Sequence, residues 1–164
     1  MAGNKRGEEA ARAWEELYGE IETCQKCILH RSRLKAVPGE GPEDADILFI
    51  GEAPGFHENL QVRRIVSAAG GFLEELLASI GLTRQEVYIA NVVKCRPPGN
   101  RDLRPEEIAA CADYLDRQIA LLKPKLIVTL GRFSMARYFP QGRISRMHGI
   151  ARQVGGVLCY PMYH

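Results

Sequence analysis

The stretch Asp46-Ile47-Leu48-Phe49-Ile50-Gly51-Glu52-Ala53-Pro54-Gly55 decides the fold of this chain. Its first half is dominated by Ile, Leu and Phe, which is typical of a strand buried on both faces of a parallel sheet. Two glycines and a proline then break the strand, and glycine lets the backbone approach a ligand closely. Ligands of α/β sheets bind beyond the carboxyl ends of the strands. The stretch therefore predicts a binding turn that presents Glu52, although an ordinary strand-ending turn has the same pattern.

Three more apolar runs alternate with helical patterns along the chain. The runs cover residues 87–93, 125–130 and 157–160, and the amphipathic patterns cover 8–22, 69–80, the segment from Pro105 to before Pro124, and 131–138. This alternation predicts a three-layer α/β/α fold with a four-stranded, mainly parallel sheet. A chain of 164 residues fits a single domain, which we expect to span residues 1–164.

Charge is segregated along the sequence despite a net charge of only +2. All 20 acidic residues lie at or before Asp116, and the 48 residues from Arg117 to His164 contain eight basic residues and no acidic one. An acid-free segment of this kind is a plausible footprint for a polyanion. Scattered, solvated arginines would give the same count.

Membrane and secretion signals are lacking in the sequence. No apolar run approaches the ~20 residues of a membrane span, and the first 23 residues contain no signal-peptide core. We therefore expect a cytoplasmic protein without a membrane partner, in which cysteines are thiols or metal ligands.

Four of the five cysteines form a candidate metal site. Cys24 and Cys27 form a C-x-x-C, a spacing that lets two thiolates reach one metal centre and that redox dithiols also use. Cys95 lies in a basic, proline-rich loop and Cys111 in the helix that follows, whereas Cys159 is expected in the core. Four thiolates suit either tetrahedral zinc or an iron–sulfur cluster, and spacing alone does not choose between them.

Polar residues follow three of the predicted strands. Glu52 follows the first, Asn91 lies near the end of the second, and His164 follows the fourth. An Asn amide offers two donors and one acceptor, enough to recognise an amide or imide edge, although neighbouring backbone could equally satisfy it. We expect the three side chains to meet at one rim of the sheet.

Several stretches together resemble the family-4 uracil-DNA glycosylases, the iron–sulfur enzymes of bacteria and archaea. They are residues 51–55, 91–101, 130–131 and 163–164, with the four cysteines, and the resemblance covers nearly the whole chain from about Trp14. It implies a monofunctional hydrolase that removes uracil from deaminated DNA in base excision repair and releases free uracil. It also implies a [4Fe–4S] cluster, in place of zinc, on Cys24, Cys27, Cys95 and Cys111.

The resemblance also assigns roles to the residues of the rim. Glu52, Ala53 and Pro54 would line the uracil pocket and the scissile bond, Asn91 would bind the uracil edge, and His164 would donate to uracil O2. A glycosylase must flip the base into a fitted pocket, and stabilising the departing anion is the main contribution to the rate. The implied catalytic residues are thus His164, Glu52 and Asn91, with no residue identified as general base.

The implied substrate is uracil-containing DNA, single- or double-stranded, bound by a monomer. Phosphate contacts are expected from basic side chains of the loop after residue 93 and of the acid-free segment. These side chains are Arg96, Arg101, Arg143 and Arg146.

Three departures from the family pattern are visible, one of which is Asn59 in place of the motif's usual acidic residue after Glu58. Relatives have Gly-Arg-Pro-Phe-Val-Gly where residues 62–67 are Val-Arg-Arg-Ile-Val-Ser, so Ile65 replaces the Phe that stacks on uracil. Stacking is worth ~1–3 kcal/mol, so we expect roughly ten- to a hundredfold weaker binding. Relatives also continue beyond His164 with a further helix, and we expect that segment to be missing from this sequence.

Two other functions fit parts of the pattern. A degenerate relative with the same iron–sulfur fold would bind DNA or damaged bases without turnover. A zinc-stapled hydrolase or nucleotide-binding domain would give a colourless preparation that contains zinc.

Overall fold

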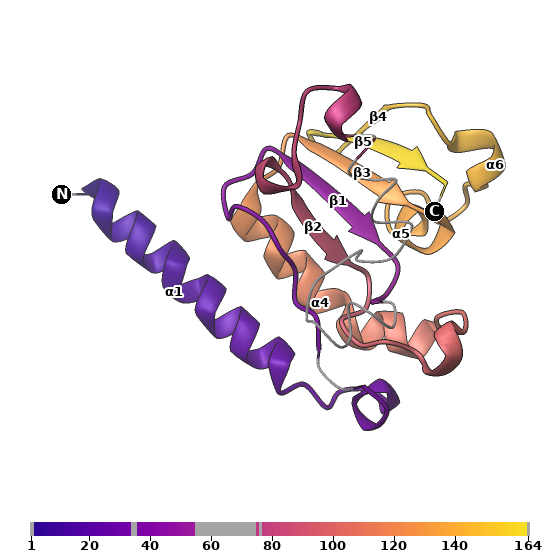
Figure 1. The fold of residues 1–164 in the computed structure, drawn as a ribbon, viewed down its shortest axis with the longest axis horizontal. Coiled ribbons are helices and arrows are strands. Elements are labelled where there is room, and N and C mark those ends of the chain that lie inside the picture. The colour runs from indigo at the N-terminus through magenta and orange to yellow at the C-terminus, as the bar shows by residue number, and fades with distance from the viewer. Residues whose placement is uncertain (1, 34–35, 55–74, 76, 164) are drawn as a thin grey trace.

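The computed structural model of the chain describes residues 2–33, 36–54, 75 and 77–163 (Figure 1). Its helices and strands follow the predicted alternation. The helices are α1 (Ala2–Glu22), α4 (Pro105–Leu122), α5 (Arg132–Ala136) and α6 (Ile144–Met147), with 3-10 turns η1 (Ile28–Arg31), η2 (Arg84–Glu86) and η3 (Pro98–Asn100). The strands are β1 (Ile47–Gly51), β2 (Tyr88–Asn91), β3 (Leu126–Leu130), β4 (Arg152–Val154) and β5 (Val157–Met162).

The strands form one sheet in the order β2-β1-β3-β5-β4. Strands β1, β2, β3 and β5 are parallel, which confirms the predicted α/β class, and β4 is antiparallel to β5. The prediction of four strands was wrong by one, because Arg152, Gln153 and Val154 contain no apolar run. They pair with β5 through a tight hairpin at Gly155 and Gly156, whose φ angles of 56° and 84° suit glycine.

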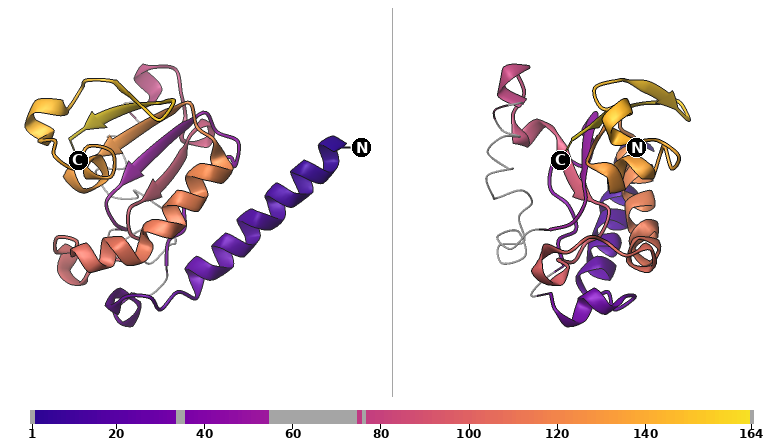
Figure 2. Two further views of the ribbon diagram at one scale, coloured as in Figure 1. Left: turned by 180° about the vertical axis from the view of Figure 1, so that it is seen from behind. Right: turned by 90° about the vertical axis from the view of Figure 1, so that its right-hand side faces the viewer.

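One helical layer covers the first face of the sheet. Trp14 of α1 and Leu115 of α4 belong to the same buried cluster as Leu48 of β1 and Ile127 of β3. Figure 2 shows α1 and α4 on this side of the strands. The apolar stripes predicted for both helices therefore face the sheet.

A second apolar cluster lies on the opposite face. Phe49 of β1, Ile89 of β2 and Val128 of β3 pack there with Leu77, which lies in a helical turn at residues 77–79. Because β1 is covered on both faces, it reads as an uninterrupted apolar run, as the sequence indicated.

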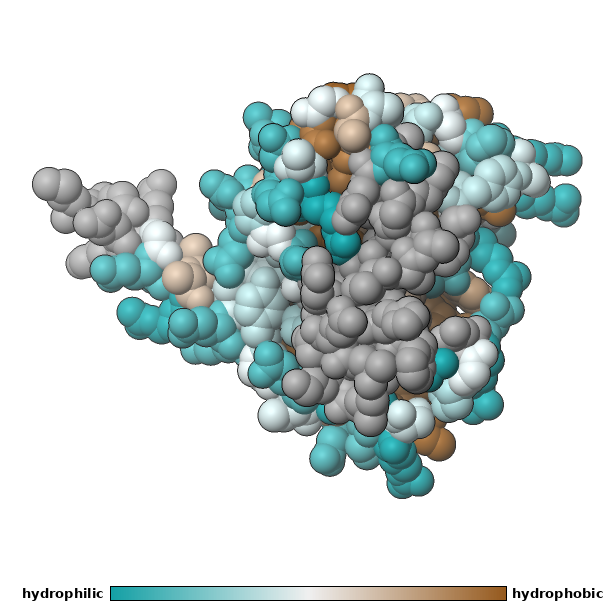
Figure 3. All heavy atoms as spheres, in the orientation of Figure 1, coloured by the Kyte–Doolittle hydropathy of each residue, from teal (hydrophilic) through white to brown (hydrophobic). Residues whose placement is uncertain are grey.

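The amino-terminal part of α1 extends away from the body of the molecule (Figure 1). Residues 7–12 are all exposed, whereas Trp14 is buried. The described surface in Figure 3 is mainly hydrophilic, with apolar side chains in small separate patches. Within the described residues, no helix has both the length and the apolar character needed to cross a bilayer.

Some of the predicted features lie outside the described residues. These are Ile65, His164 and most of the helix expected at 69–80.

Candidate active site and cysteine cavity

The register of β1 and β2 places Asn91 beside the turn that begins at Gly51. Gly51 and Asn91 are paired across the two parallel strands, and Asn91 is only 3% exposed. A Cβ atom on Gly51 would lie 2.5 Å from Asn91 Oδ1, so the Asn amide lies directly against the glycine. Because alternate residues of a strand share a face, both residues lie on the side of Phe49 and Ile89, opposite α4.

The hydrogen bonding between these strands continues into the following loops. The N–H of Val92 donates to the carbonyl of Gly51 (3.0 Å), and the N–H of Val93 donates to that of Glu52 (3.1 Å). Glu52 and Ala53 are half-buried and Pro54 is buried. The structure therefore brings the turn at 51–54 and Asn91 together, as predicted, at one end of the sheet.

The carboxyl ends of β3 and β5 extend the same edge. The N–H of Gly131 donates to the carbonyl of Met162 (2.8 Å), and that of Gly149 donates to the carbonyl of Pro161 (2.7 Å). The His148 ring lies against Tyr163, with 4.3 Å between centroids. We call residues 51–54, Asn91, Gly131 and Tyr163 the strand-end rim. His164, the third predicted rim residue, follows Tyr163 and lies outside the described residues.

The four predicted cysteines line a single small cavity of about 10 Å³ behind the rim. Cys24 and Cys27 come from the turn between α1 and η1, Cys95 from the loop after β2, and Cys111 from α4. Cys159 lies elsewhere, within β5, and is buried in the core. We call this space the cysteine cavity; its other lining residues are Lys26, His30, Arg33, Lys94, Ala110 and Tyr114.

The electrostatics of the cysteine cavity oppose ionisation of free thiols. Burial raises the pKa of Cys111 to about 11 and also raises the pKa of Cys27 and Cys95. Arg33 Nη1 donates to Cys95 Sγ at 2.9 Å and partly offsets that rise. Thiols of this kind are poor nucleophiles at neutral pH, and a bound metal would have to displace their protons.

Four thiols could hold either tetrahedral zinc or an iron–sulfur cluster. Four thiols with basic side chains around them suit an anionic cluster, since each thiolate brings a negative charge. In the described part of the chain, no three Cys, His, Asp or Glu side chains converge closely enough for a single metal ion.

The loop that carries Cys95 is joined to α4 by a buried ion pair. Arg101 donates to both carboxylate oxygens of Glu107, at 2.8 and 2.6 Å, and the Glu107 side chain is 0% exposed. Glu107 also accepts from the backbone N–H of Arg104 at the start of α4 (2.9 Å). Arg101, predicted to contact phosphate, thus has a structural partner, and its phosphate contact stays a prediction.

The other predicted phosphate contacts differ in exposure. Arg96 is half-buried, whereas Arg143 and Arg146 are exposed beside α6. The segment of α6 leads through His148 to the rim residue Tyr163. Arg143 and Arg146 are therefore close in sequence to His148, which contacts the rim.

Half of the acid-free segment is neutralised by acidic side chains from earlier in the chain. Four of its eight basic residues form ion pairs with such carboxylates, so the segregation seen in the sequence is only partly a segregation in space. The pairs are Arg117–Glu20, Lys125–Asp46, Arg132–Asp102 and Arg137–Asp116.

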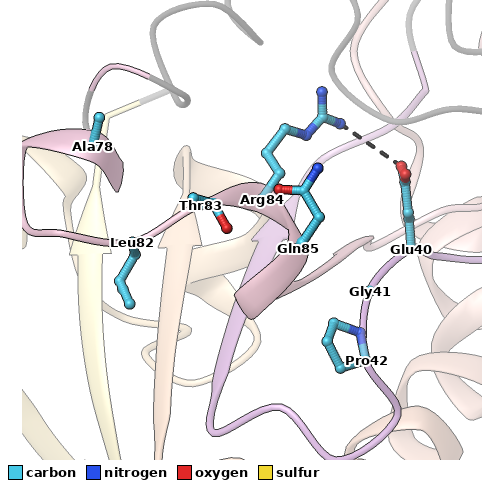
Figure 4. Close-up of a pocket in the computed structure, with 8 residues that line it drawn as sticks. All are labelled: Glu40, Gly41, Pro42, Ala78, Leu82, Thr83, Arg84 and Gln85. Atoms are coloured by element: carbon cyan, nitrogen blue, oxygen red, sulfur yellow. Dashed lines mark ion pairs between the residues drawn. The ribbon is translucent and has the colours of Figure 1, made fainter.

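A second pocket, of about 560 Å³, lies away from this chemistry (Figure 4). It is lined by residues 40–42, Ala78 and 82–85, which precede the amino end of β2, and Arg84 approaches Glu40 at 3.8 Å across it. The carboxyl ends of the strands, where ligands of α/β sheets bind, are at the other end. We therefore assign the substrate to the rim.

Sequence reasoning missed a buried polar group beside the cysteine cavity. Lys94 is 1% exposed and Gln118 is 1% exposed, and the two side chains are hydrogen-bonded at 2.7 Å. Lys94 stands in a basic loop and Gln118 on an amphipathic helix, so both patterns indicate solvent exposure. The signal available in the sequence was that Gln118, a polar residue, falls on the apolar stripe of α4.

Comparison with known proteins identifies similar sequences over most of the chain. Residues 38–164 match the family model for the uracil DNA glycosylase superfamily. A type-4 uracil-DNA glycosylase of Archaeoglobus fulgidus is 53% identical over 120 residues, which cover 73% of this chain and 60% of the relative. A type-4 uracil-DNA glycosylase of Sulfurisphaera tokodaii is 44% identical over 160 residues, with 92% and 73% covered. A type-5 uracil-DNA glycosylase of Thermus thermophilus is 34% identical over 116 residues, with 62% and 52% covered.

Proposed function

This chain belongs to the type-4 uracil-DNA glycosylases, a family of hydrolases that act on N-glycosyl bonds, and on that premise we propose that it excises uracil from DNA. The observation that carries the proposal is the buried Asn91 amide, held against Gly51 at the carboxyl edge of the sheet. A fixed amide at the ligand-binding edge is the element that a base-recognising pocket requires.

The amide of Asn91 would recognise the flipped uracil. Its NH2 group donates and its carbonyl accepts, which matches the alternating acceptors and donor of the uracil edge. Contact with Gly51 and pairing of the flanking backbone hold this amide in place before the base arrives. Glu52, Ala53 and Pro54, on the adjoining turn, would line the pocket beside the glycosidic bond.

Bond cleavage would depend on stabilising the leaving base. Negative charge develops on uracil as the bond to the sugar breaks, and fixed donors at that position lower the barrier. We assign this donation to His164, and the contact with the base face to Ile65, on the family motifs alone. Water attacks the sugar carbon, so the products are an abasic site in the DNA and free uracil.

A [4Fe–4S] cluster on Cys24, Cys27, Cys95 and Cys111 is the cofactor that we infer. The four thiols surround one cavity, and Arg33 supplies a cationic donor to one of them at 2.9 Å. When bound, the cluster would cross-link the end of α1, the loop after β2 and α4. We propose no step of bond cleavage through it.

DNA binding would use the exposed basic side chains near the rim. Arg143 and Arg146 lie on the segment that leads to Tyr163, so phosphates on either side of a flipped nucleotide would pass close to them.

The test is uracil release from a labelled oligonucleotide that contains one uracil. We expect wild-type protein to release free uracil and leave an abasic site, and Gly51→Ala to lose at least tenfold in rate because the new Cβ displaces the Asn91 amide. Iron, zinc and the visible absorption spectrum are measured on the same preparation. Binding of the oligonucleotide with no release at any enzyme concentration would favour a non-catalytic relative, and a colourless zinc protein would contradict the cluster.

A further inference from the structure

The end of β5 is in contact with His148, a residue to which the proposed reaction gives no role. His148 follows α6, and we call residues 143–149 the α6 segment. This segment lies beside β5 (Figure 1), and the N–H of Gly149 donates to the carbonyl of Pro161 at 2.7 Å. Strand β5 ends at Met162, and the next residue, Tyr163, is contacted by the His148 ring, with 4.3 Å between centroids and 41° between planes.

The α6 segment is itself anchored to the protein. A Cβ atom on Gly142 would clash with Met147 Sδ, so Met147 packs directly against the turn that follows α5. The N–H of His148 donates to the carbonyl of Ile144 at 3.0 Å and closes the single turn of α6. The His148 ring is therefore placed against Tyr163 by a hydrogen-bonded turn that is packed on its other side.

The position of Tyr163 matters because of the residue that follows it in the sequence. His164 is the residue to which we assign hydrogen-bond donation to uracil, and the two backbone torsions of Tyr163 set where the next residue begins. The N–H of Gly131 donates to the carbonyl of Met162 at 2.8 Å and holds the chain up to that point. The contact between the two rings restrains the chain one residue further, since an aromatic pair at this distance is attractive.

We propose that His148 is a positioning residue, whose ring fixes Tyr163 and thereby the start of the residue that donates to the leaving base. The ring acts by packing and takes no part in proton transfer. The same segment carries the exposed Arg143 and Arg146, so a DNA phosphate bound there would hold the ring in place while the base is cleaved. This inference rests on the proposed function, since it assumes the role of His164.

The experiment compares three variants of the whole chain. His148→Ala removes the ring, and His148→Phe keeps an aromatic ring but removes the nitrogen atoms. Ile150→Ala is the matched control, because Ile150 is an apolar residue just after the segment and is 45% exposed. Three quantities are measured: kcat and KM for uracil release, the dependence of kcat on pH, and hydrogen exchange of the peptide that contains residues 157–164.

We expect His148→Ala to lower kcat about tenfold with little change in KM, because a misplaced catalytic group slows the reaction more than it weakens binding. The peptide 157–164 should exchange faster in this variant. His148→Phe should recover most of kcat and keep the pH dependence of wild type, and Ile150→Ala should behave as wild type. An unchanged kcat in His148→Ala, a change in KM alone, or a His148→Phe variant as slow as His148→Ala would each overturn the proposal.

Hydrogen exchange separates failure of this proposal from failure of the proposed function. His148 is exposed, so its substitution opens no cavity in the core, and we expect both variants to fold as wild type does. If wild-type protein releases no uracil, the proposed function fails, and the positioning is then judged by exchange alone. Faster exchange of residues 157–164 in His148→Ala, but not in His148→Phe, would support it, and equal exchange in both variants and wild type would overturn it.

Discussion

The strand-end rim and the cysteine cavity lie at opposite sides of the same short loop and are built in different ways. The rim is assembled by strand register, because the pairing of Gly51 with Asn91 places turn and amide together without any further group. The cavity is assembled from a turn, a loop and a helix, and burial raises the pKa of three of its thiols, Cys27, Cys95 and Cys111. Under the proposed function, the rim is a recognition site that the fold alone forms, and the cavity is a support site that a cluster would complete.

Removing the Asn91 amide should have the largest effect. We expect Asn91→Ala to lower the rate of uracil release by about 10- to 100-fold, because the flipped uracil loses hydrogen bonds to the amide that are worth about 1–3 kcal/mol. The melting temperature and iron content should stay close to wild type, because the rim is held by the backbone. Steady-state kinetics on a uracil oligonucleotide measures the rate, and activity within twofold of wild type would contradict the assignment of Asn91.

Removing a thiol from the cysteine cavity should mainly lower the stability of the fold. We expect Cys111→Ala to lose the cluster and to lower the melting temperature by about 10 °C. Each kcal/mol of lost stability lowers the melting temperature of a chain of this size by ~2–4 °C, and we expect a loss of a few kcal/mol. Cys159→Ala is the matched control, because Cys159 is equally buried but lies outside the cavity. Iron analysis and thermal unfolding separate the two variants, and equal iron in both would rule out the cluster site.

The buried pair between the Cys95 loop and α4 should give the support site a pH dependence. The Arg101 guanidinium lowers the pKa of Glu107 from its ordinary 4.5, so the pair stabilises the fold above that pH and the contribution is lost as the pH falls through the lowered value. We expect Glu107→Gln to melt several degrees below wild type at pH 7, with the difference vanishing in acid. Thermal unfolding from pH 3 to 7 checks this, and a constant difference would show that the charge is not responsible.

Removing the positive charges of Arg143 and Arg146 should have the smallest effect, a weakening of DNA binding. We expect the double variant Arg143→Gln and Arg146→Gln to weaken DNA binding several-fold at low salt. The slope of log affinity against log salt should fall by about 2, one for each phosphate contact. Binding titrations at several salt concentrations measure the slope, and an unchanged slope would place the DNA elsewhere.

The sequence predicts the strand-end rim better than it predicts the polar contacts beside the cysteine cavity. The apolar run of β1 and the glycine that ends it are local signals, and parallel pairing makes the ends of neighbouring strands coincide. Lys94 and Gln118 are 24 positions apart, and each looks solvated in its own pattern, so only the packing of α4 on the loop reveals their contact. Likewise, the basic character of the segment after Asp116 is visible in the sequence, whereas its neutralisation by distant carboxylates is not.

The outer edge of β2 is covered by the chain itself. Glu40 forms an antiparallel bridge with Ile89, and the N–H of Val37 donates to the carbonyl of Lys94 (2.7 Å). The other edge of the sheet is formed by β4, which is only three residues long and includes the charged Arg152. Unpaired strand edges are the usual starting points for intermolecular β-pairing. If the protein binds DNA as proposed, copies bound to one duplex would reach high local concentrations, and this covering would keep them from joining their sheets.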